Sequence, residues 1–194
     1  MILPIVAYGH SVLKKVAVDV DINDPELPTL LENMWETMYN AEGVGIAAPQ
    51  IGKSLRIFVI DASPFAEGES PEEAAVLKNF KKVFINAEII EENGESWSFK
   101  EGCLSIPGVN EKISRKSEVT IKYLDENFKE QQETYTGLAA RVIQHEYDHI
   151  EGVLFTDKIS SLKKKLIQSK LTNISKGNIP QGYPMIFPSL KKRR

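Results

Sequence analysis

Apolar positions recur at helical spacing in three parts of the chain. After Asp24-Pro25 they recur every three or four residues as far as residues 40–43, which is typical of an amphipathic helix with one face on a core. This face consists of Leu27, Leu30, Leu31, Met34, Trp35 and Met38. The spacing returns over residues 136–149, with a stop at Gly152, and again after Ser160, which can cap a helix. The sequence therefore predicts an N-terminal amphipathic helix, a central helix and a C-terminal helix.

Short segments rich in β-branched and aromatic residues predict strands between these helices. These segments are residues 55–61, 83–91, 97–100, 111–116, 118–124 and 128–135. Asn93-Gly94 predicts a turn between the second and third, and residues 125–127 predict another before the last. Because strands and helices do not alternate regularly, we expect an α+β fold in which mostly antiparallel strands fold around the central helix.

Two segments are expected to lie outside this core. Residues 62–80 hold two prolines, a glycine and four glutamates, and they predict a mobile surface excursion. Residues 177–188 are rich in proline and glycine and predict an extended arm after the C-terminal helix. We therefore expect one domain over residues 1–175 and a basic tail over residues 176–194.

The net charge of −3 hides an asymmetry along the chain. From Lys158 onward there are ten lysines and arginines and no acid, so residues 1–157 hold fourteen basic and twenty-seven acidic residues, a balance of −13. The tail can dock on the acidic body, or it can contact an RNA backbone. The apolar runs are too short to span a membrane, no secretion signal precedes them, and one cysteine cannot form an internal disulfide. These features favour a cytoplasmic protein.

The central helix carries the pattern His145-Glu146-x-x-His149 near its end. Positions i and i+4 lie on one helix face, so the two histidines can bind one metal ion, with Glu146 beside it. This is the spacing of metal hydrolases in which the glutamate handles the protons of a metal-bound water. Two chance histidines on a polar face are the alternative. The third histidine of the chain, His10, stands alone and is more typical of a surface or core residue.

Two histidines leave a catalytic metal one protein ligand short. No histidine follows His149, and Glu151 lies two positions beyond it, off the metal face. Cys103 is the best remaining candidate for the third ligand. A lone cysteine is equally often a small buried apolar residue, so the spacing alone leaves this choice open.

Three blocks of the sequence together resemble those of the bacterial peptide deformylases. They are Gly43-Val44-Gly45-Ile46-Ala47-Ala48-Pro49-Gln50, Glu101-Gly102-Cys103-Leu104-Ser105 and Gln144-His145-Glu146-Tyr147-Asp148-His149. The resemblance runs from the N-terminal residues to about Asp157. It implies an enzyme that removes the formyl group from the N-terminal formylmethionine of new polypeptides and releases formate.

The resemblance also implies a metal site and its chemistry. Cys103, His145 and His149 would hold one divalent ion, and a water in the fourth position would attack the formyl carbon. Glu146 would act as general base and then as general acid. By coordination preference alone, two imidazoles and a thiolate suit zinc. The resemblance implies Fe(II) as the physiological ion, with zinc, nickel or cobalt able to replace it.

Further roles follow from the same resemblance. The amide of Gln50 and the backbone N–H of Leu104 would stabilise the oxyanion, and Gly45 would offer backbone groups to the substrate chain. The methionine side chain needs an apolar pocket beside the histidine face of the central helix. Candidates for this pocket are Val44, Leu138 and Val142. Arg141 lies beside the last two and receives no role.

Two other functions fit parts of the pattern. A metalloprotease of another family would cut internal peptide bonds and would use a third ligand other than Cys103. A non-catalytic ribosome-associated factor with a structural metal would need a fourth ligand, for which only His10 remains. For the deformylase, the implied partners are formylmethionyl nascent peptides, and the basic C-terminal segment suggests contact with the ribosome; we expect neither membrane nor DNA binding.

Overall fold

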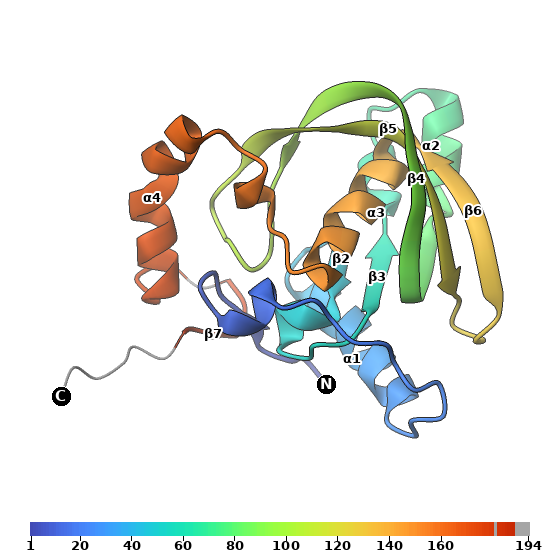
Figure 1. The fold of residues 1–194 in the computed structure, drawn as a ribbon, viewed down its shortest axis with the longest axis horizontal. Coiled ribbons are helices and arrows are strands. Elements are labelled where there is room, and N and C mark those ends of the chain that lie inside the picture. The colour runs from blue at the N-terminus through green and yellow to red at the C-terminus, as the bar shows by residue number, and fades with distance from the viewer. Residues whose placement is uncertain (181, 189–194) are drawn as a thin grey trace.

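A five-stranded sheet of order β2-β3-β4-β5-β6 forms the frame of the molecule (Figure 1). This computed structural model describes residues 1–180 and 182–188. Every neighbouring pair in the sheet is antiparallel, which confirms the predicted α+β fold. The strands are β2 (Gly45–Ala47), β3 (Ile57–Asp61), β4 (Lys81–Glu101), β5 (Glu111–Leu124) and β6 (Glu130–Thr136).

Within the described residues, four α-helices and four short 3-10 turns complete the main body. The helices are α1 (Leu27–Asn40), α2 (Pro71–Lys78), α3 (Gly137–Ile150) and α4 (Ser161–Ser175). The turns are η1 (Ser11–Lys14), η2 (Ala48–Ile51), η3 (Ser63–Ala66) and η4 (Phe155–Asp157). The predicted central helix is α3, and the predicted cap of the C-terminal helix is present, since the hydroxyl of Ser160 accepts a hydrogen bond from Lys163 N.

Alternating residues of β3 separate two layers of the core. Phe58 and Ile60 face the cluster that contains the apolar side of α3, whereas Ile57 and Val59 face the cluster that contains α1. Successive side chains of a strand point to opposite faces, so one strand serves both layers. The helix that bears the histidines is thereby held between the sheet and the rest of the molecule.

β4 and β5 are single long strands, so the prediction of two shorter strands in each place was wrong. Asn93 pairs with Glu118 and Ser96 pairs with Lys116, and the register shifts between these two pairs. Gly94 has a φ of 74°, so the expected turn is a bulge within one strand. Bulges bend a strand, and Figure 1 shows the ribbon of β4 and β5 arching over α3.

The prediction of a mobile surface excursion over residues 62–80 was also wrong. This segment forms η3 and α2, and it buries Ala66, Leu77 and Phe80 in the core that surrounds α3. A carboxylate oxygen of Glu73 accepts a hydrogen bond of 3.0 Å from Leu138 N in the first turn of α3. The segment thus helps to hold the start of the central helix.

The two ends of the described chain meet in a second, two-stranded sheet. β1 (Ile5–Val6) pairs in parallel with β7 (Met185–Ile186), so the arm after α4 lies on the body of the molecule. Of the apolar stripe predicted for α4, Leu162 and Leu166 are exposed, and the buried members are Ile167, Leu171 and Ile174. The basic residues 191–194 of the predicted tail lie outside the described residues, and the division at residue 175 remains a prediction.

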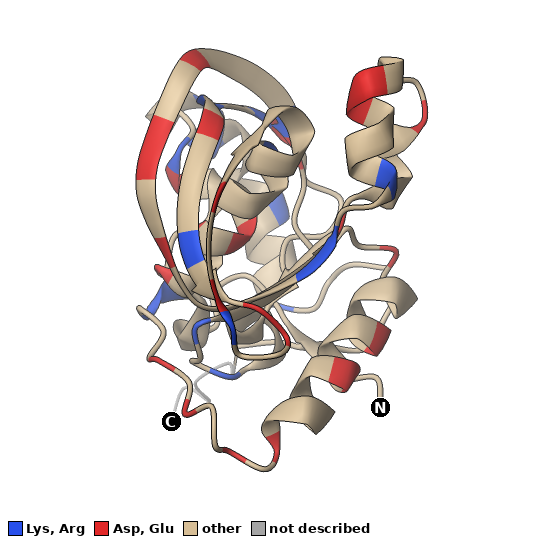
Figure 2. Ribbon diagram, turned by 90° about the vertical axis from the view of Figure 1, so that its right-hand side faces the viewer, with Lys and Arg blue, Asp and Glu red and all other residues tan. Residues whose placement is uncertain are grey.

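Acidic and basic side chains are unevenly distributed among the helices. α1 and α2 carry acidic residues, which Figure 2 shows in red. α4 has four lysines and no acid, and it lies on the opposite side from α2 and β6 in Figure 1. Among the described residues, no helix has the length and apolar content needed to cross a membrane.

Candidate active site

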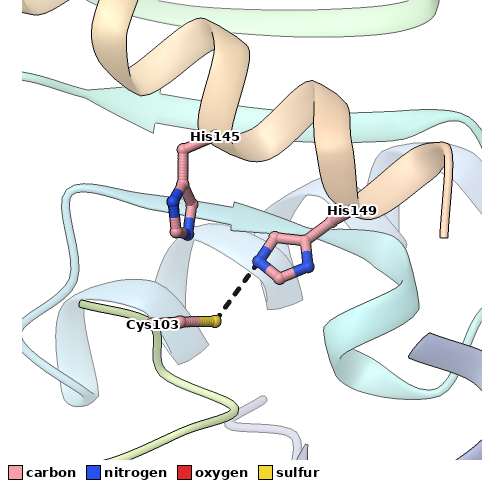
Figure 3. A group of neighbouring side chains, drawn as sticks. All are labelled: Cys103, His145 and His149. Carbon is pink, nitrogen blue, oxygen red and sulfur yellow. Dashed lines mark hydrogen bonds between the residues drawn. The ribbon is translucent and has the colours of Figure 1, made fainter. Parts of the chain in front are cut away.

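Three metal-binding side chains converge at the end of α3. His145 and His149 lie one turn apart on the same face, and Cys103 comes from the turn after β4 (Figure 3). Their ligand atoms all lie within 4.8 Å of one another, and Cys103 Sγ is 3.3 Å from His149 Nε2. A thiolate and two imidazoles at this separation form a donor set that suits a divalent transition metal. The structure therefore brings together the three residues that the sequence proposed as ligands.

Glu101 orients the first histidine. Its Oε2 lies 2.9 Å from His145 Nδ1, which leaves Nε2 of that ring free for a metal ion. Arg115 donates to both carboxylate oxygens of Glu101, at 2.7 and 2.9 Å, and Arg141 donates to one of them at 3.0 Å. Burial alone would raise the pKa of Glu101, but the hydrogen bonds from His145 and Arg115 outweigh burial and hold the pKa far below its ordinary value. Glu101 is therefore a carboxylate at neutral pH.

The same network continues along α3. Arg115 donates a third hydrogen bond, of 2.7 Å, to Asp148, whose other oxygen pairs with Lys158 at 3.1 Å. Arg141 is buried and donates to the carbonyl oxygens of Ile113 and Trp97. Sequence reasoning missed the roles of Glu101 and Arg115, although Glu101 stands at the start of one of the three blocks. No local spacing links residues that lie fourteen or more positions apart.

Glu146 lies buried beside the histidines and against β2. A Cβ atom placed on Gly45 would be 2.5 Å from Glu146 Oε1, so only glycine lets the two segments approach this closely. Burial raises the pKa of Glu146 to about 7. Its Oε2 has no hydrogen-bond partner among the described residues. Such a carboxyl group can exchange a proton with a molecule in the site near neutral pH.

The side chain of Gln50 is fixed with its NH₂ group toward the site. Its Oε1 accepts a hydrogen bond of 2.8 Å from Ala47 N, and its Nε2 lies 3.5 Å from Cys103 Sγ. The first contact settles which end of the amide is the donor. An amide held in this way can donate to an oxygen that develops charge beside the three ligands.

These residues open onto a cavity of about 440 Å³. Val44, Gly45, Leu104 and Val142 line it, together with Gln50, Glu146 and two of the three candidate ligands, Cys103 and His145. Leu138 is buried and is not among the lining residues. His10 lies apart from the cavity, where its Nδ1 accepts a hydrogen bond of 3.3 Å from Val12 N at the start of η1. Tyr183 also lines the cavity, and no pattern in the sequence pointed to it.

Comparison with known proteins identifies the family of this chain. The sequence model of the family described as "Polypeptide deformylase" matches residues 2–165. The chain belongs to this family. The peptide deformylase of Christiangramia forsetii is 62% identical over an alignment of 196 residues that covers both chains completely.

Solved deformylase structures share the fold. The crystal structure of a peptide deformylase from Legionella pneumophila superimposes with a TM-score of 0.79 at 38% identity, over 93% of this chain and 99% of the other. A Met-Ala-Ser-bound deformylase from Acinetobacter baumannii has a TM-score of 0.73 at 33% identity, over 82% of this chain and 99% of the other. The chain is thus an enzyme of the deformylase family, which removes formyl groups from N-formylated polypeptides. This membership sets aside both a metalloprotease of another family and a non-catalytic factor.

Proposed function

We propose that the deformylase removes the formyl group from N-terminal formylmethionine with one divalent ion held by Cys103, His145 and His149. The observation that carries this proposal is the convergence of those three ligand atoms within 4.8 Å, beside a cavity that Cys103 and His145 line together with Glu146 and Gln50. A divalent ion bound there would supply a Lewis acid that makes water nucleophilic near neutral pH. We expect Fe(II) as the physiological ion, with zinc, nickel or cobalt able to replace it.

Glu146 is proposed to carry the proton of the reaction. It would take a proton from the attacking water and later deliver it to the nitrogen of the leaving methionine. Its burial and its pKa of about 7 support both steps, because the group can accept and release a proton at the same pH. The close packing of Gly45 against the carboxyl group would hold it in place.

Gln50 and Leu104 are proposed to stabilise the oxygen of the formyl group. When the carbonyl carbon is attacked, its oxygen gains negative charge and needs donors that are already in position. The fixed amide of Gln50 and the backbone N–H of Leu104, next to Cys103, would provide them.

The substrate chain is proposed to lie along β2. This strand is at one edge of the five-stranded sheet, so its free backbone groups, including those of Gly45, can pair with an extended peptide. Val44 and Val142 offer an apolar wall for the methionine side chain, and Leu138 would contribute from behind them. The Met-Ala-Ser peptide bound to the Acinetobacter baumannii deformylase supports binding of a peptide of this kind.

We further propose that the enzyme works in the cytoplasm, where formylated chains are made, and that its lysine-rich C-terminal part contacts the ribosome. The single cysteine fits a reducing compartment. The four lysines and the absence of acids in α4 fit a phosphate backbone as partner.

The test is formate release from formyl-Met-Ala-Ser by anaerobically purified enzyme, with bound metal quantified. We expect Glu146→Ala to retain metal and to lose activity by about 10²–10⁴-fold, and Cys103→Ala to lose metal as well. Exposure of the wild type to air should lower activity, and Fe(II) under reducing conditions should restore it, because both Fe(II) and a thiolate are prone to oxidation. A metal-loaded wild type that releases no formate would refute the proposal, and indifference to oxygen would refute iron.

A further inference from the structure

The arm that follows α4 carries a tyrosine into the active-site cavity. Tyr183 lines the same cavity as Gln50, Cys103 and Glu146. Its hydroxyl donates a hydrogen bond of 2.6 Å to the carbonyl oxygen of Leu104, which lies 79 positions earlier in the chain. The arm lies beyond residues 2–165, the part that the family model matches. It therefore gives Leu104 a contact from outside the three blocks that carry the family resemblance.

The arm is anchored directly after Tyr183. Pro184 O accepts a hydrogen bond of 2.9 Å from Ile5 N, and Ile186 O accepts one of 2.8 Å from Ala7 N. Farther along, the ring of Phe187 lies 3.2 Å from the position of a Cβ on Gly177, so the arm packs closely on the segment after α4. These contacts fix the backbone next to Tyr183, and the tyrosine itself is half-buried.

Leu104 lies in a turn whose other carbonyl groups already have partners. Cys103 O accepts a hydrogen bond of 2.8 Å from Ile106 N, and Ser105 O accepts one of 2.8 Å from Tyr8 N. Tyr183 supplies the partner for the carbonyl between them. The Leu104 N–H shares a rigid peptide plane with Cys103 O, and Leu104 O belongs to the next plane, which is joined to the first at the Leu104 Cα. Hydrogen bonds to both carbonyl oxygens therefore restrain both planes and with them the direction of the N–H.

We propose that Tyr183 is a positioning residue for deformylation, which holds the Leu104 backbone so that its N–H faces the oxygen of the formyl group. This inference rests on the proposed role of Leu104 as an oxyanion donor. The hydroxyl is suited to the task, because burial and the nearby Cys103 raise the pKa of Tyr183 to about 12. It stays protonated at neutral pH and can donate throughout the working range of the enzyme.

The substitution Tyr183→Phe tests the inference, because it removes the hydroxyl and keeps the ring. We expect kcat for formyl-Met-Ala-Ser to fall about tenfold, less than the loss of a whole oxyanion donor, which costs about 10²–10³-fold. KM, the inhibition constant of the product Met-Ala-Ser and the metal content should stay within about twofold of the wild type, because neither ground-state binding nor the ligands change.

Tyr39→Phe is the matched control. The hydroxyl of Tyr39 also donates a hydrogen bond within the protein, to a carboxylate oxygen of Asp61 at 2.7 Å. Tyr39 does not line the cavity. The control should keep the kcat of the wild type. An equal loss of kcat in both variants, an unchanged kcat in Tyr183→Phe, or a raised KM with unchanged kcat would overturn the inference.

The substitution Gln50→Leu distinguishes a failure of the positioning role of Tyr183 from a failure of the proposed oxyanion site. If Gln50→Leu lowers kcat and Tyr183→Phe does not, the positioning role fails and the oxyanion site stands. If neither substitution lowers kcat, the oxyanion site itself fails and the positioning role fails with it.

Discussion

Glu101 is the residue on which the buried charges of the site depend. One carboxylate accepts hydrogen bonds from Arg115, Arg141 and His145, and all four side chains are buried or nearly so. Buried charges are tolerated when each has a partner, and the loss of one partner leaves the others uncompensated. Glu101 thus links the orientation of a metal ligand to the stability of the protein.

We predict that Glu101→Gln weakens both properties. Metal affinity should fall by about 10–100-fold, because His145 loses the partner that orients its ring. The free energy of unfolding should fall by about 3–5 kcal/mol, because Arg141 loses its counter-charge and Arg115 keeps only that of Asp148. Metal titration and urea unfolding would measure the two effects. Glu111→Gln, which alters a surface pair with Lys163, is the control and should change neither by more than a small amount.

For single residues, the sequence predicts the candidate metal ligands better than the side chains that orient them. His145 and His149 follow from helical spacing, because both lie on one element. Cys103 could be assigned only through resemblance, since its distance from the histidines depends on the tertiary fold. Arg141 received no role from the sequence, and the structure shows that its guanidinium donates to Glu101.

Among the elements, η4 carries Asp157, which links η1 and α4 to the segment that follows α3. One oxygen of Asp157 accepts a hydrogen bond of 2.9 Å from Leu154 N and also pairs with Lys14, and the other pairs with Lys164 at 3.2 Å. Burial opposes ionisation, but the hydrogen bonds from Lys14 and Leu154 N outweigh it and lower the pKa of Asp157 below its ordinary value of 3.8.

The stabilisation by Asp157 should therefore depend on pH. A carboxylate with a lowered pKa in the folded state stabilises the protein above the ordinary pKa, and this contribution is lost as pH falls through the lower folded value. We predict that Asp157→Asn lowers the free energy of unfolding by about 1 kcal/mol at neutral pH. In urea titrations the difference from the wild type should shrink as pH falls below 3.8. A difference that stays constant down to the acid limit would contradict this account.

Element types were predictable along most of the chain, and the exceptions have a common cause. The turn signal at Asn93-Gly94 was overridden because β5 pairs with β4 on both sides of it, so the extra residues became a bulge. The acidic segment over residues 62–80 was taken for a surface loop, yet Leu77 and Phe80 are buried in the main core. Tertiary pairing and burial decided both cases, and neither is visible in a short window of sequence.

For the molecule as a whole, the concentration of lysines on α4 provides a test of the proposed ribosome contact. Lys163, Lys165 and Lys170 lie on α4, and changing all three to glutamine should weaken salt-sensitive association with ribosomes by about tenfold or more. Co-sedimentation at two salt concentrations would measure this change. The control replaces Lys53, Lys78 and Lys129, which are exposed and lie outside α4. Equal association of both triple variants would remove α4 as the contact.

The pairing of β1 with β7 is the part of the global fold that the sequence could not indicate. Each strand has two residues, and the partners lie near opposite ends of the chain. Segments this short have no periodicity to detect, so the arm looked like a separate tail. The contact of Tyr183 with Leu104 depends on this pairing and was equally invisible.

The residues of the site lie far apart in the sequence, and this affects whether the protein folds before or after it binds a metal ion. Cys103 and His149 are 46 positions apart, and Tyr183 and Leu104 are 79 apart. Contacts between such distant positions form late in folding, because each one closes a long loop. An unfolded chain offers at most the two neighbouring histidines to a metal ion. Folding should therefore precede capture of the ion, and the ion should act as a ligand that stabilises a finished protein rather than as the nucleus around which the protein folds.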